Sequence, residues 1–385
     1  MNDRLKKLLE HAQVPRVHKK YVRREFEDEF ELVVDQFLDD SQNQPSHLVL
    51  TGISGVGKTS LVQHLLWNRS DIVGHHFKRV LYVSDNTTDP KNLSKVLMNT
   101  FFYLSNGIPD GDIVKLFENE VSFLIVKLRQ LINETKKVLI VLDGVYLSEV
   151  VDVFKSFNCS LLLTTSCRDL KNQMDNVHSY HMTLEHTKRE DVLNLATLYG
   201  LTKMTENYAD VILKITGGNI AMIEKMFTFA KGDFLRLKFT VGQIRIGNLS
   251  QLECISYYPY RSINTSLENI CYFVKPTVSQ QMVTLSLLQS NIWVRVEVLS
   301  KLWPVDLADN SDAQLCQIIM NEMESLGDLS LIDTTLADKN VRIPALLRYY
   351  LLAETGPADL TWEIYNMLIF GILGIQQVHS SFENR

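Results

Sequence analysis

The clearest chemical signal in the sequence is a glycine-rich stretch that begins at Gly52. Residues 52–59 read Gly-Ile-Ser-Gly-Val-Gly-Lys-Thr, which matches the phosphate-binding pattern G-x-x-x-x-G-K-[ST] at every fixed position. Its glycines let successive backbone N–H groups turn toward phosphate oxygens, and a helix starting there adds the positive end of its dipole. Lys58 would reach the β- and γ-phosphates, and the Thr59 hydroxyl would bind Mg²⁺. The nucleotide-binding residues predicted from this stretch are Gly52, Ser54, Gly55, Val56, Gly57, Lys58, Thr59 and Ser60.

A carboxylate that could share the metal follows farther along the chain. Residues 136–143 read Lys-Lys-Val-Leu-Ile-Val-Leu-Asp, an apolar run that ends at Asp143, as the metal-binding strand of such proteins does. Asp143 would hold Mg²⁺ opposite Thr59. The next residue is Gly144, where many ATPases with this loop carry a second acid that orients the attacking water. We therefore predict weak or absent hydrolysis and leave open whether the protein is an enzyme.

These groups need a sheet to position them, and the first half of the sequence predicts one. Short β-rich runs alternate with helical patterns, which is typical of a parallel sheet covered by helices. Each run is continuously apolar, as strands buried on both faces require. The expected strands are residues 47–51, 79–84, 138–142, 160–165 and 180–183. We therefore predict an α/β P-loop NTPase domain.

The pattern changes after residue 185. Helical segments follow to about residue 230. Farther on, helices mix with short β-like stretches around residues 330–332 and 341–343, which suits a winged-helix module. The predicted domains are residues 1–20 as an N-terminal linker or helix, 21–184 as the nucleotide-binding α/β P-loop domain, 185–238 as a helical domain, 239–355 as a winged-helix domain and 356–385 as a C-terminal helical segment.

Composition narrows the setting in which the protein works. The formal net charge of -6 gives no overall attraction to nucleic acid or to anionic membranes. The most apolar run, residues 367–375, is much shorter than the roughly 20 residues that span a bilayer. The five cysteines are scattered and form no C-x-x-C pair, which fits a reducing compartment rather than a disulfide framework or a zinc site. The N-terminus has no apolar signal-peptide core. We expect a cytoplasmic protein without membrane insertion.

Two segments beyond the phosphate loop resemble the NB-ARC class of signalling ATPases. Residues 161–165, Leu-Leu-Leu-Thr-Thr, resemble the sensor strand of that class, which continues with an arginine; here two residues intervene before Arg168. The resemblance implies that Arg168 reaches the γ-phosphate. Residues 216–221 resemble the Gly-x-Pro segment of the class, whose proline packs against adenine. Ile220 stands at the position of that proline.

The N-terminal region carries a third resemblance. Residues 14–25, VPRVHKKYVRRE, resemble the segment that covers adenine in NB-ARC proteins, and Tyr21 and Arg23 match the residues expected there. Further runs at residues 198–200, 253–255, 258–262 and 301–306 resemble the caspase-activating adaptors of the family. The resemblance covers most of the chain.

The family resemblance implies a fold, a cofactor and partners. The fold is an α/β nucleotide-binding domain followed by helical and winged-helix domains, and the cofactors are ATP or ADP with Mg²⁺. The resemblance also implies self-association into a ring-shaped oligomer, caspase-pathway partners and restraint by an anti-apoptotic Bcl-family protein, which could bring the protein to mitochondria. Adaptors of this kind carry an N-terminal caspase-recruitment domain, and we expect this chain to lack it.

Four functions remain open at this point. The first is a nucleotide-gated assembly switch that regulates apoptosis and caspase activation. The second is a slow ATPase of the AAA-like remodelling type, against which the missing acid at Gly144 argues. The third is a nucleic-acid-binding protein, which the acidic balance disfavours. The fourth is a nucleotide-binding decoy or scaffold without the recruitment domain.

Overall fold

The computed structural model describes the chain in two compact units. The first unit comprises Met1–Ala209 and Asn219–Glu224, and the second comprises Asp210–Gly218 and Lys225–Arg385. The described residues are 6, 8–10, 12–84, 92–105, 121–174, 178–245, 271, 274–275, 278–279, 282–288, 292–300, 312–329, 331–335, 338–345, 347–348 and 350–351. The sequence runs at 253–255, 258–262 and 301–306, the apolar run 367–375 and the predicted segment 356–385 lie outside them.

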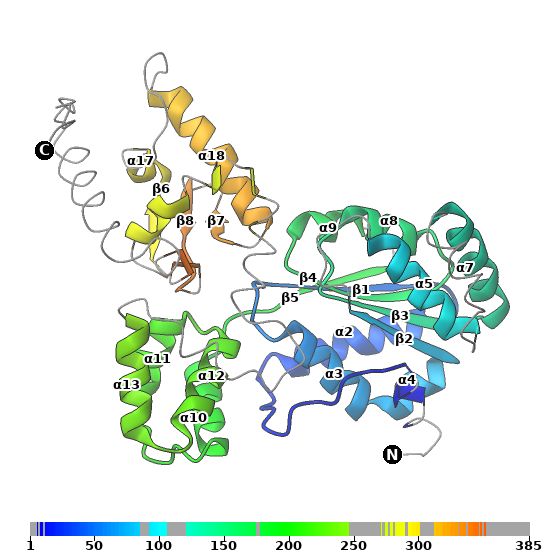
Figure 1. Cartoon of the computed structure of the whole chain (residues 1–385), viewed down its shortest axis with the longest axis horizontal. Coiled ribbons are helices and arrows are strands. Elements are labelled where there is room, and N and C mark those ends of the chain that lie inside the picture. The colour runs from blue at the N-terminus through cyan, green and yellow to red at the C-terminus, as the bar shows by residue number, and fades with distance from the viewer. Residues whose placement is uncertain are drawn as a thin grey trace, which may run out of the picture. The chain divides into compact units, whose positions relative to one another are not determined.

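A five-stranded parallel sheet forms the centre of the first unit (Figure 1). Its strands are β1 (His47–Thr51), β2 (Arg79–Ser84), β3 (Val138–Asp143), β4 (Ser160–Thr165) and β5 (Ser179–Thr183), in the order β2-β3-β4-β1-β5. Every residue of β1, β3 and β4 is buried, which explains why each strand reads as an apolar run with polar residues only at its ends. The predicted strands and the α/β P-loop fold are confirmed. The expectation that each strand is buried on both faces is wrong for β5, an edge strand that is partly exposed along its whole length.

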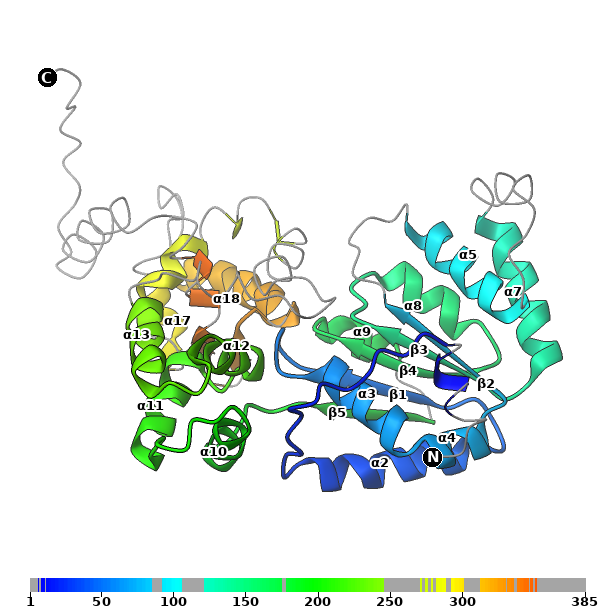
Figure 2. The ribbon, with the colours of Figure 1, turned by 60° about the horizontal axis from the view of Figure 1, so that its bottom comes forward.

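Helices cover both faces of this sheet (Figures 1 and 2). On one face lie α2 (Glu27–Asp40), α3 (Lys58–Asn68) and α4 (Ser70–His76); on the other lie α5 (Asn92–Ser105), α7 (Val121–Thr135), α8 (Ser148–Lys155) and α9 (Arg168–Gln173). Phe30 and Phe37 of α2 and Leu61 of α3 share one buried core with Leu48 and Leu50 of β1. Because all strands are parallel, the carboxyl ends of β1, β3 and β4 meet at one edge, where a ligand site is expected.

The N-terminal strap, which we define as residues 14–26, lies against the core of the first unit. Val14 is buried in it, and the indole Nε1 of Trp67 on α3 donates to the carbonyl of Pro15 (2.8 Å). The guanidinium carbon of Arg16 lies 3.6 Å from the ring centroid of the same tryptophan. Farther along, the ammonium of Lys20 lies 3.6 Å from the ring centroid of Tyr199. These contacts direct the strap toward the start of α3.

Helices follow the sheet in the sequence. Helix α10 (Arg189–Leu198) belongs to the first unit, and α11 (Glu206–Thr216) and α12 (Ile220–Ala230) each include residues of both units. In the second unit come α13 (Phe234–Arg245), the 3₁₀ helix η1 (Met282–Leu287), α17 (Val296–Leu299) and α18 (Asp312–Asp328). Among the described residues, no helix has the length and apolar character needed to cross a membrane.

A small antiparallel sheet completes the described part of the second unit. It pairs β6 (Trp293–Arg295) with β8 (Asn340–Arg342), and β8 with β7 (Asp333–Thr335). The β-like stretch expected around 341–343 corresponds to β8. The stretch expected around 330–332 is misplaced, because Leu331 and Ile332 are buried core residues that precede β7. Their apolar character comes from the core that they fill rather than from strand pairing.

Candidate functional site

The glycine-rich loop connects β1 to α3 at the carboxyl edge of the sheet. Gly55 (φ 79°) and Gly57 (φ 100°) adopt left-handed conformations that other residues rarely take. A Cβ on Gly55 would lie 2.6 Å from Oδ1 of Asn219, and a Cβ on Gly57 would lie 3.0 Å from Nη2 of Arg24. The glycines therefore serve two purposes: they turn the backbone, and they let two other segments of the chain approach it closely.

Lys58, the first residue of α3, is held against this loop. Its Nζ donates to the carbonyls of Gly52 (2.7 Å) and Ile53 (3.0 Å) and to Oγ of Ser166 (2.9 Å). Burial lowers the pKa of Lys58 to about 7, while the nearby Asp143 carboxylate acts in the opposite direction. An anion beside this ammonium would favour the charged lysine, as phosphate binding requires.

Asp143 ends β3 directly opposite Thr59. It is 2% exposed, and its Oδ1 accepts hydrogen bonds from the hydroxyls of Thr59 (2.8 Å) and Thr164 (2.7 Å). Its other oxygen, Oδ2, accepts from the Tyr82 hydroxyl (2.7 Å). The structure thus brings together the two predicted metal ligands. A hydroxyl and a carboxylate are hard oxygen donors that fit Mg²⁺, which commonly takes one or two protein ligands and completes its shell with phosphates and water.

Few side chains near Asp143 could bind a metal, and this limits the kind of metal ion that fits the site. Within the part of the chain that the structure describes, no group of three or more His, Cys, Asp or Glu residues could hold an ion. A metal at Thr59 and Asp143 would therefore depend on ligand oxygens, which is typical of a nucleotide-bound Mg²⁺.

The residue after Asp143 has a backbone conformation that favours glycine. Gly144 has φ 75°, and its N–H donates to both the carbonyl (3.1 Å) and the hydroxyl (2.8 Å) of Thr164. An acid at this position would have to adopt the left-handed conformation, at a cost of about 1–3 kcal/mol. The local structure thus favours the glycine and offers no carboxylate directly after Asp143.

The two predicted adenine-covering residues of the strap have different surroundings. The hydroxyl of Tyr21 donates to Oε1 of Glu27 (2.8 Å), and its ring stacks on His64 of α3 with centroids 4.2 Å apart. Burial and the Glu27 carboxylate raise the pKa of Tyr21. Arg23 is half exposed and pairs with Asp28 (2.5 Å) and Glu31 (3.0 Å) of α2.

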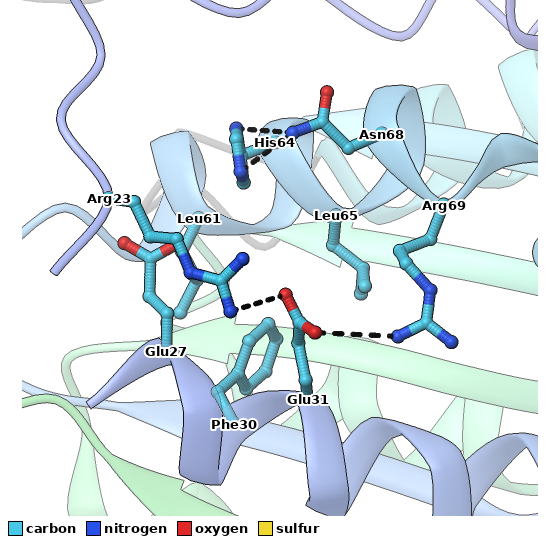
Figure 3. A pocket seen from close by; sticks show the side chains of 9 residues that line it. All are labelled: Arg23, Glu27, Phe30, Glu31, Leu61, His64, Leu65, Asn68 and Arg69. Atoms are coloured by element: carbon cyan, nitrogen blue, oxygen red, sulfur yellow. Dashed lines mark hydrogen bonds and ion pairs between the residues drawn. The ribbon is translucent and has the colours of Figure 1, made fainter. Parts of the chain in front are cut away.

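Arg23 also lines a pocket of about 240 Å³ between α2 and α3 (Figure 3). The lining residues are Arg23, Glu27, Phe30, Glu31, Leu61, His64, Leu65, Asn68 and Arg69. Arg23 and Arg69 both pair with Glu31 there. The charges of Arg23 are therefore directed toward α2, and its role in nucleotide binding stays a prediction.

The neighbouring Arg24 is the strap residue that contacts the phosphate loop, and the sequence analysis missed it. The side chain is buried, and Nη1 donates to the Val56 carbonyl (2.9 Å). Its guanidinium carbon lies 4.4 Å from the ring centroid of Phe26. Burial lowers the pKa of Arg24. Glu27, three residues later, accepts from the Arg24 N–H (2.8 Å), an interaction typical of a helix start, but this signal concerns the backbone and not the direction of the Arg24 side chain.

The start of α12 forms a third contact with the loop. The Asn219 side chain donates from Nδ2 to the Ser54 carbonyl (2.7 Å), and the Ala221 N–H donates to the Gly55 carbonyl (3.1 Å). Ile220, predicted to pack on adenine, has its Cγ2 3.4 Å from a Cβ built on Gly57. Asn219 was not predicted. Asparagine is a favoured helix N-cap, and its Oδ1 accepts from the Met222 N–H (3.2 Å), so this signal was present in the sequence.

The remaining predicted residues are Ser60 and Arg168. Ser60 lies in the first turn of α3, and Arg168 is the half-buried first residue of α9. Ser166, two residues before that arginine, supplies the hydroxyl that contacts Lys58. The structure therefore gathers the loop, Asp143, Ile220, Arg24 and Ser166 at one edge of the sheet, and the roles of the individual residues remain predictions.

Comparisons with known proteins agree with this arrangement. Residues 26–206 match the family model of the NB-ARC domain. The chain is 22% identical over 311 residues to cell death protein 4 of Caenorhabditis briggsae, covering 73% of this chain and 54% of that protein. It is 23% identical over 285 residues to apoptotic protease-activating factor 1 of Homo sapiens, covering 72% of this chain and 22% of that protein.

A solved structure shares the fold. A Walker-type ATPase of Pyrococcus abyssi superposes with a TM-score of 0.53 at 14% identity, covering 88% of this chain and 98% of that one. The chain spans about half the length of cell death protein 4 and about a fifth of the length of apoptotic protease-activating factor 1. Residues 26–206 are therefore an NB-ARC domain, and the family predicted from the sequence is confirmed.

Proposed function

We propose that this protein is a nucleotide-dependent signalling switch. ATP or ADP, held with Mg²⁺ at the phosphate loop, controls how the domains close and whether the protein assembles into an oligomer. The observation that carries the proposal is the convergence of two distant segments on the phosphate loop. Arg24 of the strap donates to the Val56 carbonyl and Asn219 donates to the Ser54 carbonyl, while Lys58 of the loop donates to the Gly52 carbonyl. A ligand at this loop would contact segments that are far apart in the sequence.

Binding rather than turnover is the proposed activity. Gly144 provides no acid to position a water, and positioning is one of the few tasks that phosphoryl transfer leaves to the protein. A nucleotide can still shift a conformational equilibrium if it binds one arrangement more tightly than the other. Hydrolysis would then be at most a slow reset of the switch.

The biological setting of the proposal comes from the relatives. Their names connect them to cell death and to protease activation in apoptosis, so we place this protein in the regulation of apoptosis and of caspases. The proposed architecture has a helical domain at residues 185–238 and a winged-helix domain at 239–355. The proposed partners are further copies of the chain, caspase-pathway proteins and an anti-apoptotic Bcl-family regulator, in the cytoplasm or at mitochondria through such a partner.

Analysis of bound nucleotide tests the proposal. The full chain is purified without added nucleotide and denatured, and the released nucleotide is identified by chromatography while light scattering gives the mass of the native sample. We expect near-stoichiometric ADP or ATP, and a mass that changes when ADP is exchanged for ATP and Mg²⁺. Lys58→Ala should lose both the nucleotide and the change in mass. Assembly that persists unchanged in Lys58→Ala would contradict the switch.

A further inference from the structure

Glu224 is an acid in an unexpected place. It lies on α12 one turn after Ile220, and positions i and i+4 share one face of a helix. Ile220 approaches Gly57, and Glu224 follows one turn later on the same face of the helix. Within the described part of the chain, the Glu224 carboxyl group forms no hydrogen bond or ion pair, although most of it is buried.

The group that faces Glu224 is the guanidinium of Arg24. The two interact electrostatically, and Glu224 and Arg24 are each named among the charges that act on the other's pKa. Arg24 is also faced by Tyr21 of the strap, Glu27 of α2 and Asp191 of α10. Among the described residues, its side chain donates one hydrogen bond, to the Val56 carbonyl, although a guanidinium has five N–H donors.

Hydrogen bonds hold Arg24 and the start of α12, the helix that carries Glu224, beside the loop. The Asn219 side chain and the Ala221 N–H attach the start of α12 to the loop carbonyls. Nη2 of Arg24 lies within 3.0 Å of a Cβ built on Gly57, which precedes the phosphate-binding Lys58. A nucleotide at the loop would therefore bring its oxygens close to Arg24, a cation with unused donors on which the Glu224 charge acts.

We propose that Glu224 is a positioning residue that sets the affinity of the phosphate loop for nucleotide by acting on Arg24. This inference rests on the proposed function. The ionised carboxylate draws Arg24 toward itself and repels the anionic nucleotide, so it weakens binding. The protonated acid no longer attracts Arg24, whose unused N–H groups can then donate to the nucleotide. Glu224 thus makes nucleotide binding sensitive to proton concentration.

The titration of Glu224 makes this effect measurable near neutral pH. Burial raises the pKa of Glu224 to about 7, with Arg24 acting in the opposite direction. An anionic ligand nearby raises that pKa further, so binding takes up a proton. In acid the carboxyl group is already protonated in the free protein and does not oppose binding. In alkali it is ionised, and nucleotide binding must either protonate it or tolerate the repulsion.

The experiment measures ADP affinity of the full chain by calorimetry at several pH values. The variants are Glu224→Gln, which cannot ionise, and Glu190→Gln as a matched control at an exposed position of α10. We expect the affinity of Glu224→Gln to equal that of the wild type at pH 6. At pH 8 it should be about fivefold tighter, for a one-unit rise in the Glu224 pKa on binding. Lys58 also titrates on binding, but its effect is common to the wild type and Glu224→Gln, so it cancels in the ratio of their affinities.

Further measurements separate this role from a structural one. At pH 7.5 the wild type should take up about half a proton more than Glu224→Gln, measured in buffers of different ionisation enthalpy. In an Arg24→Met background the effect of Glu224→Gln should shrink. Two results would overturn the inference while leaving the proposed function intact. One is a ratio of Glu224→Gln to wild-type ADP affinity that stays the same at all pH values. The other is a pH dependence of ADP affinity in Glu190→Gln like that in Glu224→Gln. A wild type that binds no nucleotide would overturn both.

Discussion

Two regions of the first unit meet at the same loop and are built differently. The sheet side consists of Lys58, Thr59 and Asp143, which are placed by the ends of β1 and β3. The strap side consists of the N-terminal strap and residues 219–224, which lie outside the sheet. On the sheet side, Asp143 accepts three hydrogen bonds from hydroxyl groups. On the strap side, Arg24 donates one from its side chain to the described residues.

This difference suggests a division of labour around the phosphate. Groups that satisfy one another, as Asp143 and its hydroxyl donors do, form a rigid scaffold whose geometry a ligand does not need to create. Charged groups with unused bonding capacity, such as Arg24 and Glu224, can exchange partners when a ligand arrives. We therefore expect the loss of Asp143, which accepts three buried hydrogen bonds, to lower folding stability more than any single substitution on the strap side.

The largest effect is expected for Asp143→Ala. This change leaves the hydroxyls of Thr59, Thr164 and Tyr82 without their acceptor in a buried setting, so unfolding in urea should show a loss of about 3 kcal/mol or more. Asp143→Asn keeps one carbonyl acceptor and should cost less. Both variants should lose any dependence of nucleotide binding on Mg²⁺. A stability loss below about 1 kcal/mol in Asp143→Ala would show that the sheet side is not a self-satisfied scaffold.

The next effect is the pH dependence of folding stability. Lys58 on the sheet side and Glu224 on the strap side should change this stability in opposite directions as pH rises. The Lys58 pKa falls from 10.5 to about 7 on folding, so above pH 7 the unfolded chain binds more protons and stability rises with pH. The Glu224 pKa rises from 4.5 to about 7, so between these values the folded chain binds more protons and stability falls as pH rises. Each contribution amounts to at most about 1.4 kcal/mol per pH unit within its window.

Urea unfolding without nucleotide, from pH 5 to pH 9, measures both contributions. Together they place a minimum of stability near pH 7. Lys58→Met should remove the rise above this pH, and Glu224→Gln should remove the fall below it. Each variant is the control for the other, because each should leave the opposite limb unchanged. Identical profiles in all three proteins would contradict the assigned burial of both groups.

The sheet side could be predicted from the sequence for a physical reason. A strand buried on both faces is mostly apolar, so β1, β3 and β4 are visible as apolar runs with polar residues only at their ends. The phosphate loop needs glycine at positions with left-handed backbone, and this need leaves a spaced pattern in the sequence. Since parallel strands bring their carboxyl ends to one edge, the pairing of Thr59 with Asp143 followed from the motif and the predicted parallel sheet.

The strap side could not be predicted to the same precision. An irregular segment has no period, so nothing in the strap determines which of two consecutive arginines faces inward. Arg23 turns to carboxylates on the outer side of α2, whereas Arg24 reaches the Val56 carbonyl. This choice depends on tertiary contacts. The misplaced strand at 330–332 has a related cause, because a short apolar pair looks the same in a strand and in a core turn.

Arg23 and Arg24 are adjacent in the strap, so they give the most direct comparison of a side chain that faces the loop with one that faces away from it. Arg24→Met removes a buried charged hydrogen bond and should lower stability by about 2 kcal/mol. Arg23→Met removes exposed ion pairs and should change stability by no more than about 0.5 kcal/mol. Urea unfolding measures both. If nucleotide binds as proposed, Arg24→Met should also weaken ADP binding by about tenfold or more. Equal effects of the two variants would show that the outward ion pairs of Arg23 carry more energy than exposed pairs usually do.

The smallest effect tests how α12 is attached to the loop. Asn219 has two tasks: its Oδ1 caps α12 through the Met222 N–H, and its Nδ2 donates to the Ser54 carbonyl. Asn219→Ser keeps a good cap but is too short to reach that carbonyl, whereas Asn219→Ala loses both interactions. We expect urea unfolding to show a loss of about 1 kcal/mol for Asn219→Ser and about 1 kcal/mol more for Asn219→Ala.

Hydrogen exchange separates the cap from the attachment. The Ala221 N–H donates to the Gly55 carbonyl, so its protection reports the contact between α12 and the loop, whereas the Met222 N–H reports the cap. In Asn219→Ser, exchange at Ala221 should accelerate more than exchange at Met222. Equal acceleration at both amides would mean that cap and attachment open as one unit. The strap side would then be as rigid as the sheet side, and its unused charges could not exchange partners independently.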